Sequence, residues 1–504
     1  MSGLGQKVTS GAVWVTLSKL FGQIVHFIVG MVLARLLTPD DYGTVALLSI
    51  FFAIAGSIAS CGFGNALVQK KEAGDIEFNS VFYTSVAMSF VVYAILFLVA
   101  PYIADFYHTP VLCSVTRVSA IQFVLSAINS IQGAEISRKM LFDKQFKISM
   151  ITCIVSAVFG ILFAFMGFGV WALVWASLLT SISGIMASWT IVAWRPKLMY
   201  SFSAVKGLFS YGWKLSLSGM IHTTYTNLYG FLVGRIYTPA DLAYVNKGQS
   251  MPNLLMSTID GTILGVSFPA LAKLQDDGSR FREAVRRMVK CSTFLVFPLM
   301  AGLSLCARPL ILLLYGHQWE PAIPYVQIAC FGFALFPFSS INTAAISAAG
   351  RSDVFLLLEI LKKGVGITLM LCTIRHGVFV FMCVMSVVQP FFGMVVNATA
   401  VGRLFGYNLR MQLVDTLPYV CLCIFMYGVV LAMQALVRST FIHVPESYLG
   451  MFVVLLVSFV FGVIFYVGLA ILFKLQAFRE YVKAVQPYLN GRLPKVSVFL
   501  GKLV

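Results

Sequence analysis

Long apolar segments, each about as long as a bilayer is thick, recur along almost the whole chain. A helix that crosses roughly 30 Å of hydrocarbon needs about 20 mostly apolar residues. Windows of that length predict about fourteen spans with short connections, at residues 12–36, 42–67, 79–101, 111–133, 147–168, 170–193, 206–234, 241–267, 288–307, 321–348, 354–374, 377–402, 413–437 and 447–473. Because 59% of the 504 residues are hydrophobic and only 11% are charged, a polar surface on all sides is excluded. We predict an all-α integral membrane protein.

The positions of Lys and Arg predict which side of the membrane each connection faces, because positively charged loops stay in the cytoplasm. With the N-terminus inside, the even-numbered connections and both tails hold about 25 of the 36 cations, and the odd-numbered connections hold about 5. Both termini are therefore expected in the cytoplasm. The net charge of +17 is then mostly a topology signal, and the sequence has no basic domain in which nucleic acid would bind.

One decapeptide occurs twice in similar form, as VLARLLTPDD at residues 32–41 and as LVGRIYTPAD at residues 232–241. Proline ends a helix and the nearby Asp can cap the next one, so the motif itself is typical of a turn. Six predicted spans separate the copies, which gives both halves the same orientation, as in transporters built from parallel repeats. We expect six-helix bundles at residues 1–200 and 201–403 that enclose a central cleft. Two extra helices and a cytoplasmic tail would follow at residues 404–504.

Two spans at matching repeat positions carry a stripe of polar side chains on one helical face. The first stripe consists of Lys19, Gln23 and His26, and the second of Lys214, Ser218, His222 and Tyr225. A charge at bilayer depth costs roughly 2.5–3.5 kcal/mol, so such residues should face a wet cavity or a partner. The matching placement favours the cleft. The alternative is that both lysines extend to the inner headgroups and that neighbouring helices satisfy both histidines.

Further polar residues lie inside other predicted spans. They are Arg117, Gln122 and Asn129 in the fourth span, Lys247, Asn253 and Asp260 in the eighth, and Asn342 in the tenth. Hydroxyl and amide groups suit a sugar, but they also hold membrane helices together, and both interpretations stay open. Glu359 lies three and four residues before Lys362 and Lys363, a spacing that favours structural pairing.

Apart from that group, the cations inside the spans outnumber the acids. Lys19, Arg117, Lys214 and Lys247 stand against Asp260 alone. At 4 Å and an effective dielectric near 20, each would gain roughly 4 kcal/mol from a unit negative charge before desolvation. Phosphate or pyrophosphate fits that demand. The sequence shows no glycine-rich phosphate loop, metal-ligand spacing or paired nucleophile and base, so we expect no catalytic residue, cofactor or metal.

Three further stretches, together with the first decapeptide, carry a resemblance to a known family. ALVQKKE at residues 66–72, FPALAKLQDD at 268–277 and YGHQWEPAIPYVQ at 315–327 are similar to signatures of the polysaccharide transporter family. This family belongs to the multidrug/oligosaccharidyl-lipid/polysaccharide (MOP) flippase superfamily, and the likeness is greatest to its colanic-acid-exporter-like branch. The resemblance implies a transporter of undecaprenyl-pyrophosphate-linked oligosaccharides across the bacterial cytoplasmic (inner) membrane. The transported units would be assembled into exopolysaccharide, capsule or the O-antigen of lipopolysaccharide.

The resemblance also implies roles and partners. Related lipid flippases hold the pyrophosphate with cations in the central cleft, a role that corresponds in position and charge to Lys19, Lys214 and Lys247. Relatives often use Arg, whose bidentate fork Lys lacks. The implied partners are the lipid-linked oligosaccharide, membrane lipid and polysaccharide polymerase or export proteins.

Two other functions remain as alternatives. A cation-coupled multidrug antiporter of the same superfamily would need membrane carboxylates, and Asp260 and Glu359 are the two deep in the predicted spans. A membrane glycosyltransferase or polymerase would be expected to place catalytic carboxylates on a large outer loop. The longest outer connection runs only from Arg308 to Glu320, which argues against an enzyme.

Overall fold

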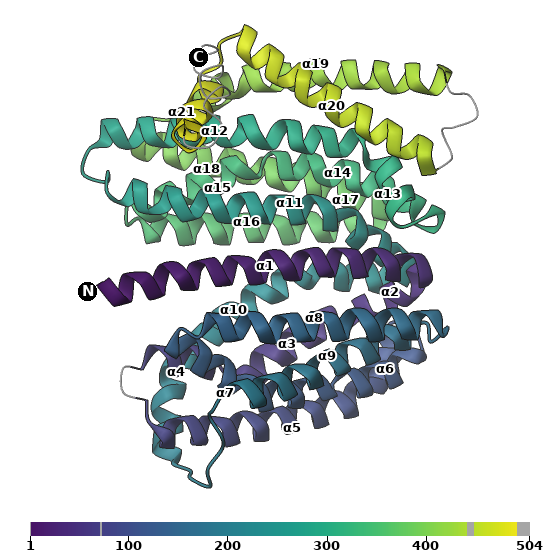
Figure 1. Ribbon diagram of the computed structural model, residues 1–504, viewed down its shortest axis with the longest axis vertical. Coiled ribbons are helices and arrows are strands. Elements are labelled where there is room, and N and C mark those ends of the chain that lie inside the picture. The colour runs from purple at the N-terminus through teal and green to yellow at the C-terminus, as the bar shows by residue number, and fades with distance from the viewer. Residues whose placement is uncertain (1, 71–72, 441–447, 491–504) are drawn as a thin grey trace. The chain divides into compact units, whose positions relative to one another are not determined.

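The computed structural model describes residues 2–70, 73–440 and 448–490, and over these ranges all regular secondary structure is helical (Figure 1). The chain divides into two compact units, Met1–Ala243 and Tyr244–Val504. The first contains α1 Ser2–Leu36, α2 Pro39–Leu47, α3 Ser49–Ser60, α4 Phe63–Gln69, α5 Asp75–Phe106, α6 Val111–Ser119, α7 Ile121–Lys139, α8 Phe142–Phe165, α9 Val170–Ile191 and α10 Phe202–Ile236.

The second unit follows from within the next long helix. Its helices are α11 Pro239–Ala272, α12 Gly278–Leu305, α13 Ala307–Leu314, η1 His317–Ala322, α14 Ile323–Ala334, α15 Phe336–Ala348, α16 Ser352–Thr373, η2 Ile374–His376, α17 Val378–Cys383, η3 Val384–Val388, α18 Gln389–Phe405, α19 Leu409–Thr440, α20 Tyr448–Leu472 and α21 Gln476–Asn490.

Twelve helical segments within the described residues are long and apolar enough to cross a membrane, which is the pattern of a multi-pass membrane protein. The other two spans expected from the sequence coincide with α10 and α16. The middle of α16 carries Glu359, Lys362 and Lys363. The middle of α10 is rich in uncharged Thr and Tyr, so this helix has a lower mean hydropathy than the twelve. The total of fourteen spans and the cytoplasmic placement of both termini stay predictions.

The helix α10 packs within the first unit. Its side chain Phe231 stacks on Phe106 at the end of α5, with ring centroids 5.2 Å apart. Gly212 lies against Gly62, which has a left-handed backbone with φ of 68°. A Cβ atom at Gly62 would meet the backbone oxygen of Gly212 at 2.3 Å, so glycine is required there. The compact unit therefore extends to Ala243, whereas the repeat boundary expected at residue 200 is a separate prediction.

The two copies of the repeated decapeptide form the same local structure. In the first, the Thr38 hydroxyl donates to Asp41 Oδ2 at 2.7 Å and accepts from the Asp41 N–H at 3.3 Å. In the second, Thr238 and Asp241 make the same contacts at 2.7 and 3.1 Å. Each is a capping box, in which Thr is the cap and Asp completes it from the first turn. The predicted turn is confirmed, with Thr rather than Asp at the capping position.

A second repeated motif appears once the partners of two prolines are known. FLVAP at residues 97–101 lies in α5, and FLVFP at residues 294–298 lies in α12, 197 positions later. Proline has no N–H, so the carbonyl four residues earlier loses its helical donor. In α12, the Tyr466 hydroxyl of α20 donates to that carbonyl, Phe294 O, at 2.9 Å. An unsatisfied backbone carbonyl is costly in hydrocarbon, so Tyr466 compensates for the proline.

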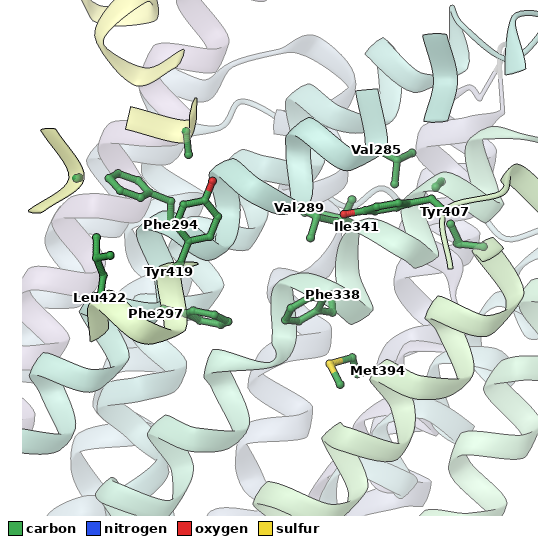
Figure 2. Packing of buried hydrophobic residues seen from close by; sticks show 14 of the residues in the cluster. Val285, Val289, Phe294, Phe297, Phe338, Ile341, Met394, Tyr407, Tyr419 and Leu422 are labelled. Atoms are coloured by element: carbon green, nitrogen blue, oxygen red, sulfur yellow. The ribbon is translucent and has the colours of Figure 1, made fainter. Parts of the chain in front are cut away.

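The core of the second unit forms around α12, as Figure 2 shows. Phe294 and Phe297 of α12 meet Phe338 of α15 and Tyr419 of α19. The later helices join this cluster through Tyr466 of α20 and Ala477 of α21, both buried. The segment predicted as two extra helices and a tail thus shares one core with α12 over its described part.

Candidate functional site

The first predicted stripe lies on α1, which is continuous from residue 2 to residue 36. Lys19, Gln23 and His26 therefore share one face, as the spacing predicts. Lys19 and His26 are exposed and Gln23 is partly buried. The helix packs against α8 through a neighbouring face that includes Val29 and Leu33. The stripe is thus left outside the packed core of the first unit.

The second predicted stripe lies on α10, in the same unit. Lys214, Ser218 and His222 are exposed, and Tyr225 is partly buried. Within the described part of the chain, neither Lys19 nor Lys214 forms an ion pair with a carboxylate. Two uncompensated ammonium groups on exposed helix faces can bind an anion, and the histidines and hydroxyls beside them can hydrogen-bond to it.

Arg117, predicted as an anion ligand, has another partner. Its Nε donates to Phe97 O at 3.3 Å, and its guanidinium carbon lies 4.3 Å from the centroid of the Phe97 ring. Phe97 O is the carbonyl that Pro101 leaves without a helical donor. Arg117 therefore compensates for Pro101 in the first unit as Tyr466 compensates for Pro298 in the second. The structure thus gives Arg117 a structural task that charge counting could not reveal.

Lys247 of α11 also has partners within the protein. Its ammonium lies 4.2 Å from the ring centroid of Tyr315 and 5.4 Å from that of Trp319, which is fully buried. Cation–π contacts of this kind stabilise a partly desolvated ammonium. Burial raises the pKa of Tyr315 to about 12, so its ring stays neutral. The motif YGHQWEP thus supplies the aromatic faces that hold Lys247, and in this conformation Lys247 is not available as an open anion ligand.

The remaining predicted side chains divide between packing and exposure. Asn342 is fully buried and exchanges hydrogen bonds of 3.0 and 3.2 Å with Gln412 of α19. Asn342 therefore joins two helices and does not line a cavity. Of the two roles considered for its amide, sugar binding and helix packing, the structure shows helix packing. Asp260 accepts a hydrogen bond from Ser340. Gln122 accepts one from Ser177 at 3.3 Å.

Asn129 and Asn253 keep more of their hydrogen-bonding capacity. Asn253 is exposed on α11, and Asn129 Oδ1 is buried without a hydrogen-bond partner among the described residues. The pairing predicted for Glu359 is confirmed, because Lys362 Nζ lies 2.5 Å and Lys363 Nζ 4.0 Å from its carboxylate.

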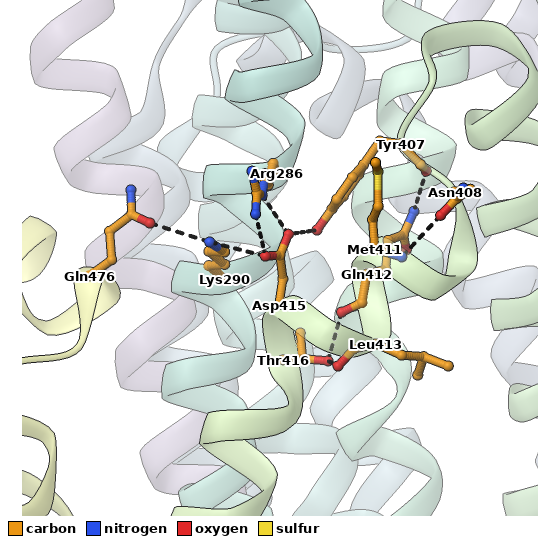
Figure 3. A network of polar contacts seen from close by, with 10 residues as sticks. All are labelled: Arg286, Lys290, Tyr407, Asn408, Met411, Gln412, Leu413, Asp415, Thr416 and Gln476. Atoms are coloured by element: carbon orange, nitrogen blue, oxygen red, sulfur yellow. Dashed lines mark hydrogen bonds and ion pairs between the residues drawn. The ribbon is translucent and has the colours of Figure 1, made fainter. Parts of the chain in front are cut away.

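The sequence did not predict one charged cluster that the structure shows. Asp415, near the start of α19, accepts two hydrogen bonds of 2.6 Å from Arg286 and contacts Lys290 at 3.2 Å (Figure 3). The Tyr407 hydroxyl donates to the same carboxylate at 3.1 Å, and burial raises the pKa of Tyr407. The available signal was the acid in MQLVDTLPY together with two cations at i and i+4 in RRMVK.

The sequence is similar to proteins of polysaccharide biosynthesis. A family model described as "Polysaccharide biosynthesis protein" matches residues 32–324. The teichuronic acid biosynthesis protein TuaB of Bacillus subtilis is 23% identical over 70% of this chain and 74% of its own length. The succinoglycan biosynthesis transport protein ExoT of Rhizobium meliloti is 26% identical over 69% and 70%. The lipid II flippase MurJ in an inward closed conformation covers 90% of this chain and 98% of its own, with a TM-score of 0.70 and 13% identity.

Proposed function

Because this chain belongs to the polysaccharide biosynthesis protein family, whose model covers residues 32–324, we propose that it is a flippase for lipid-linked oligosaccharides. Its substrate is an undecaprenyl-pyrophosphate-linked repeat unit, and it works in the cytoplasmic (inner) membrane of a bacterium. The flipped units supply exopolysaccharide, capsule or O-antigen assembly. The transport role named for ExoT and the lipid-linked substrate named for MurJ support this proposal.

The observation that carries the proposal is the exposure of two unpaired lysines on the first helix of each repeat. Lys19 and Lys214 are the predicted cations that keep no carboxylate or aromatic partner among the described residues. A pyrophosphate brings at least two negative charges, which two ammonium groups can neutralise. Gln23, His26, Ser218 and His222 follow the lysines along the same faces and offer hydrogen bonds to sugar hydroxyls.

The proposed mechanism is alternating access. The pyrophosphate enters from the cytoplasm and binds Lys19 and Lys214, while the polyprenyl tail stays in lipid. The repeat halves then change their tilt and expose the sugar to the outside. Arg117 and Lys247 take part indirectly, the first through its hydrogen bond to Phe97 O in α5 and the second through the aromatic contacts of α11. The protein provides binding and movement without a covalent step, and a polymerase receives the unit outside.

Charge removal tests this function. Lys19→Gln and Lys214→Gln should each abolish polymer export and the movement of lipid-linked oligosaccharide between leaflets of proteoliposomes. Lys363→Gln is the matched control, because this lysine belongs to the Glu359 ion-pair group and should give a mild effect. Equal loss from all three variants at equal protein levels would point to folding damage and overturn the assignment.

The antiporter alternative is disfavoured by the partners of the two deep carboxylates. Asp260 accepts a hydrogen bond from the Ser340 hydroxyl, and Glu359 forms an ion pair with Lys362. A cation-coupled antiporter needs carboxylates that can release and take up a cation. A drug-resistance assay in a sensitised strain separates the two functions, because the flippase confers no resistance.

A further inference from the structure

A strongly basic surface lies at the end of the second unit where α12 begins. The first thirteen residues of α12 contain five cations, Arg280, Arg282, Arg286, Arg287 and Lys290, and one acid, Glu283. The network of Figure 3 joins this end to the start of α19 through Asp415 and to α21 through Gln476. The orientation predicted from the loop charges places this end on the cytoplasmic side.

This surface is hollowed between α12 and α21. A cavity of about 570 Å³ is lined by side chains that include Arg280, Arg286, Arg287, Lys290, Gln476 and Glu480. The cavity lies within one compact unit. Its volume is large enough for a phosphate-bearing headgroup, because ligand pockets start at about 300 Å³.

The cations of the cavity are fixed in position by contacts on one side. Arg286 uses Nε and Nη2 for the two oxygens of Asp415, so the N–H groups of its Nη1 remain for another acceptor. Lys290 contacts the same carboxylate. Arg286 and Lys290 together therefore carry two positive charges against the single negative charge of Asp415. Arg287 is held by Glu480 of α21, and Arg280 by Asp277 at 3.3 Å. All three arginine side chains are still more than half exposed.

The surroundings of the cavity correspond to the headgroup level of a bilayer. The preceding helix α20 ends at Leu472, and Leu472 and Phe473 are 71% and 62% exposed. Lys474 follows at once and turns the chain into α21. The helix α21 is held to the unit by Ala477 and Val482, both buried. Exposed apolar side chains beside fixed cations suit a ligand that has both acyl chains and a phosphate.

We infer that this cavity binds the phosphate of an acidic phospholipid from the cytoplasmic leaflet. The leaflet supplies anionic headgroups at the surface, and arginine recognises phosphate oxygens in a forked geometry. Leu472 and Phe473 lie against the acyl chains, while Arg280, Arg286 and Arg287 contact the phosphate. The inference is independent of the substrate, since it uses no residue of the two lysine stripes.

Lipid binding by the full chain tests the inference. The purified protein in detergent is titrated with dihexanoyl phosphatidylglycerol, with dihexanoyl phosphatidylcholine and with glycerol 3-phosphate, and bound ligand is counted by native mass spectrometry. Arg280→Gln/Arg287→Gln removes two charges from the cavity. The matched control is Arg403→Gln/Arg410→Gln, two exposed arginines in the same unit that do not line it.

The wild-type protein and the control should prefer phosphatidylglycerol, and the cavity variant should bind it at least about tenfold more weakly. An equal loss in both double variants would overturn the inference, because diffuse surface charge would then explain binding. Equal binding of glycerol 3-phosphate and phosphatidylglycerol would overturn the lipid assignment in favour of a soluble phosphate. If the double variant melts below the wild type, Arg280→Gln alone, at a largely exposed side chain, must still weaken lipid binding.

Discussion

The hydroxyl of Tyr466 donates a 2.9 Å hydrogen bond to the carbonyl of Phe294, the group that Pro298 deprives of its helical donor. The guanidinium of Arg117 does the same for Phe97 and Pro101. The two sequences FLVAP and FLVFP are 197 positions apart, and the capping boxes at Thr38 and Thr238 are 200 apart. Two different local structures thus each occur twice at nearly the same interval, which supports the parallel duplication.

The Tyr466 contact predicts a measurable loss of stability. Tyr466→Phe removes only the hydroxyl, and it leaves the Phe294 carbonyl without a donor in an apolar environment. We expect the free energy of unfolding to fall by about 1–3 kcal/mol, seen as a lower midpoint of thermal unfolding in detergent.

Two comparisons isolate the proline as the cause. Tyr481→Phe removes a hydroxyl that donates to Cys291 O at 3.2 Å, but the residue four positions later is Leu295, which keeps its N–H. Its effect should be smaller. Pro298→Ala restores the missing donor, so Tyr466→Phe should cost less in that background. Equal costs with Pro298 and with alanine would contradict the explanation.

Arg117 should behave as a structural residue and not as a substrate ligand. Arg117→Gln should lower the unfolding midpoint through loss of a charge-assisted hydrogen bond worth about 1.5–3 kcal/mol. The flipping rate per folded molecule should change much less. Lys19→Gln should show the opposite pattern, with a wild-type midpoint and no flipping. Loss of flipping by a fully stable Arg117→Gln protein would restore Arg117 to the anion site.

The repeated capping boxes predict matching effects at the two copies of the decapeptide. Thr38→Ala and Thr238→Ala each leave an N–H at a helix start without its acceptor, at a cost of about 1 kcal/mol. Asp40→Asn is the control, because Asp40 is exposed in the same turn and lies outside the box. Thermal unfolding measures all three. A control as destabilised as the Thr variants would mean that the charge of the turn, and not the cap, matters.

A structural feature could be predicted from the sequence where the residues that determine it are close together along the chain. The spans follow from apolar length, and the Thr-Pro-x-Asp turns from a four-residue pattern. The sequence analysis assigned Arg117 and Lys247 to one anion site because it counted the charges in each span. Such a count does not show which side chain or carbonyl each cation contacts in the folded protein. Phe97 O needs a donor only because of Pro101, and it meets Arg117 only after α6 packs on α5. Tyr315 and Trp319 lie about seventy residues beyond Lys247, a distance that no periodicity bridges.

Lys247 should be coupled to its aromatic partners. Lys247→Met keeps most of the side chain but removes the charge, and Tyr315→Leu removes one ring. Because the ammonium lies 4.2 Å from that ring centroid, the two changes should be less than additive by about 0.5–2 kcal/mol in a double-mutant cycle. Strict additivity would show that the contact contributes nothing.

The exposure of Lys19 and Lys214 predicts contact with water in mid-membrane. In a background where the exposed Cys372 and Cys421 are replaced, Lys19→Cys and Lys214→Cys should react with a charged thiol reagent, because that reagent does not partition into lipid. Ile24→Cys is the control, since Ile24 is 58% exposed on the opposite side of α1 and should be shielded by acyl chains. If position 24 reacts as fast as position 19, or if positions 19 and 214 stay unlabelled, the stripes face lipid or dry contacts. The lysines would then extend to the headgroups, and the pyrophosphate would have to be bound elsewhere.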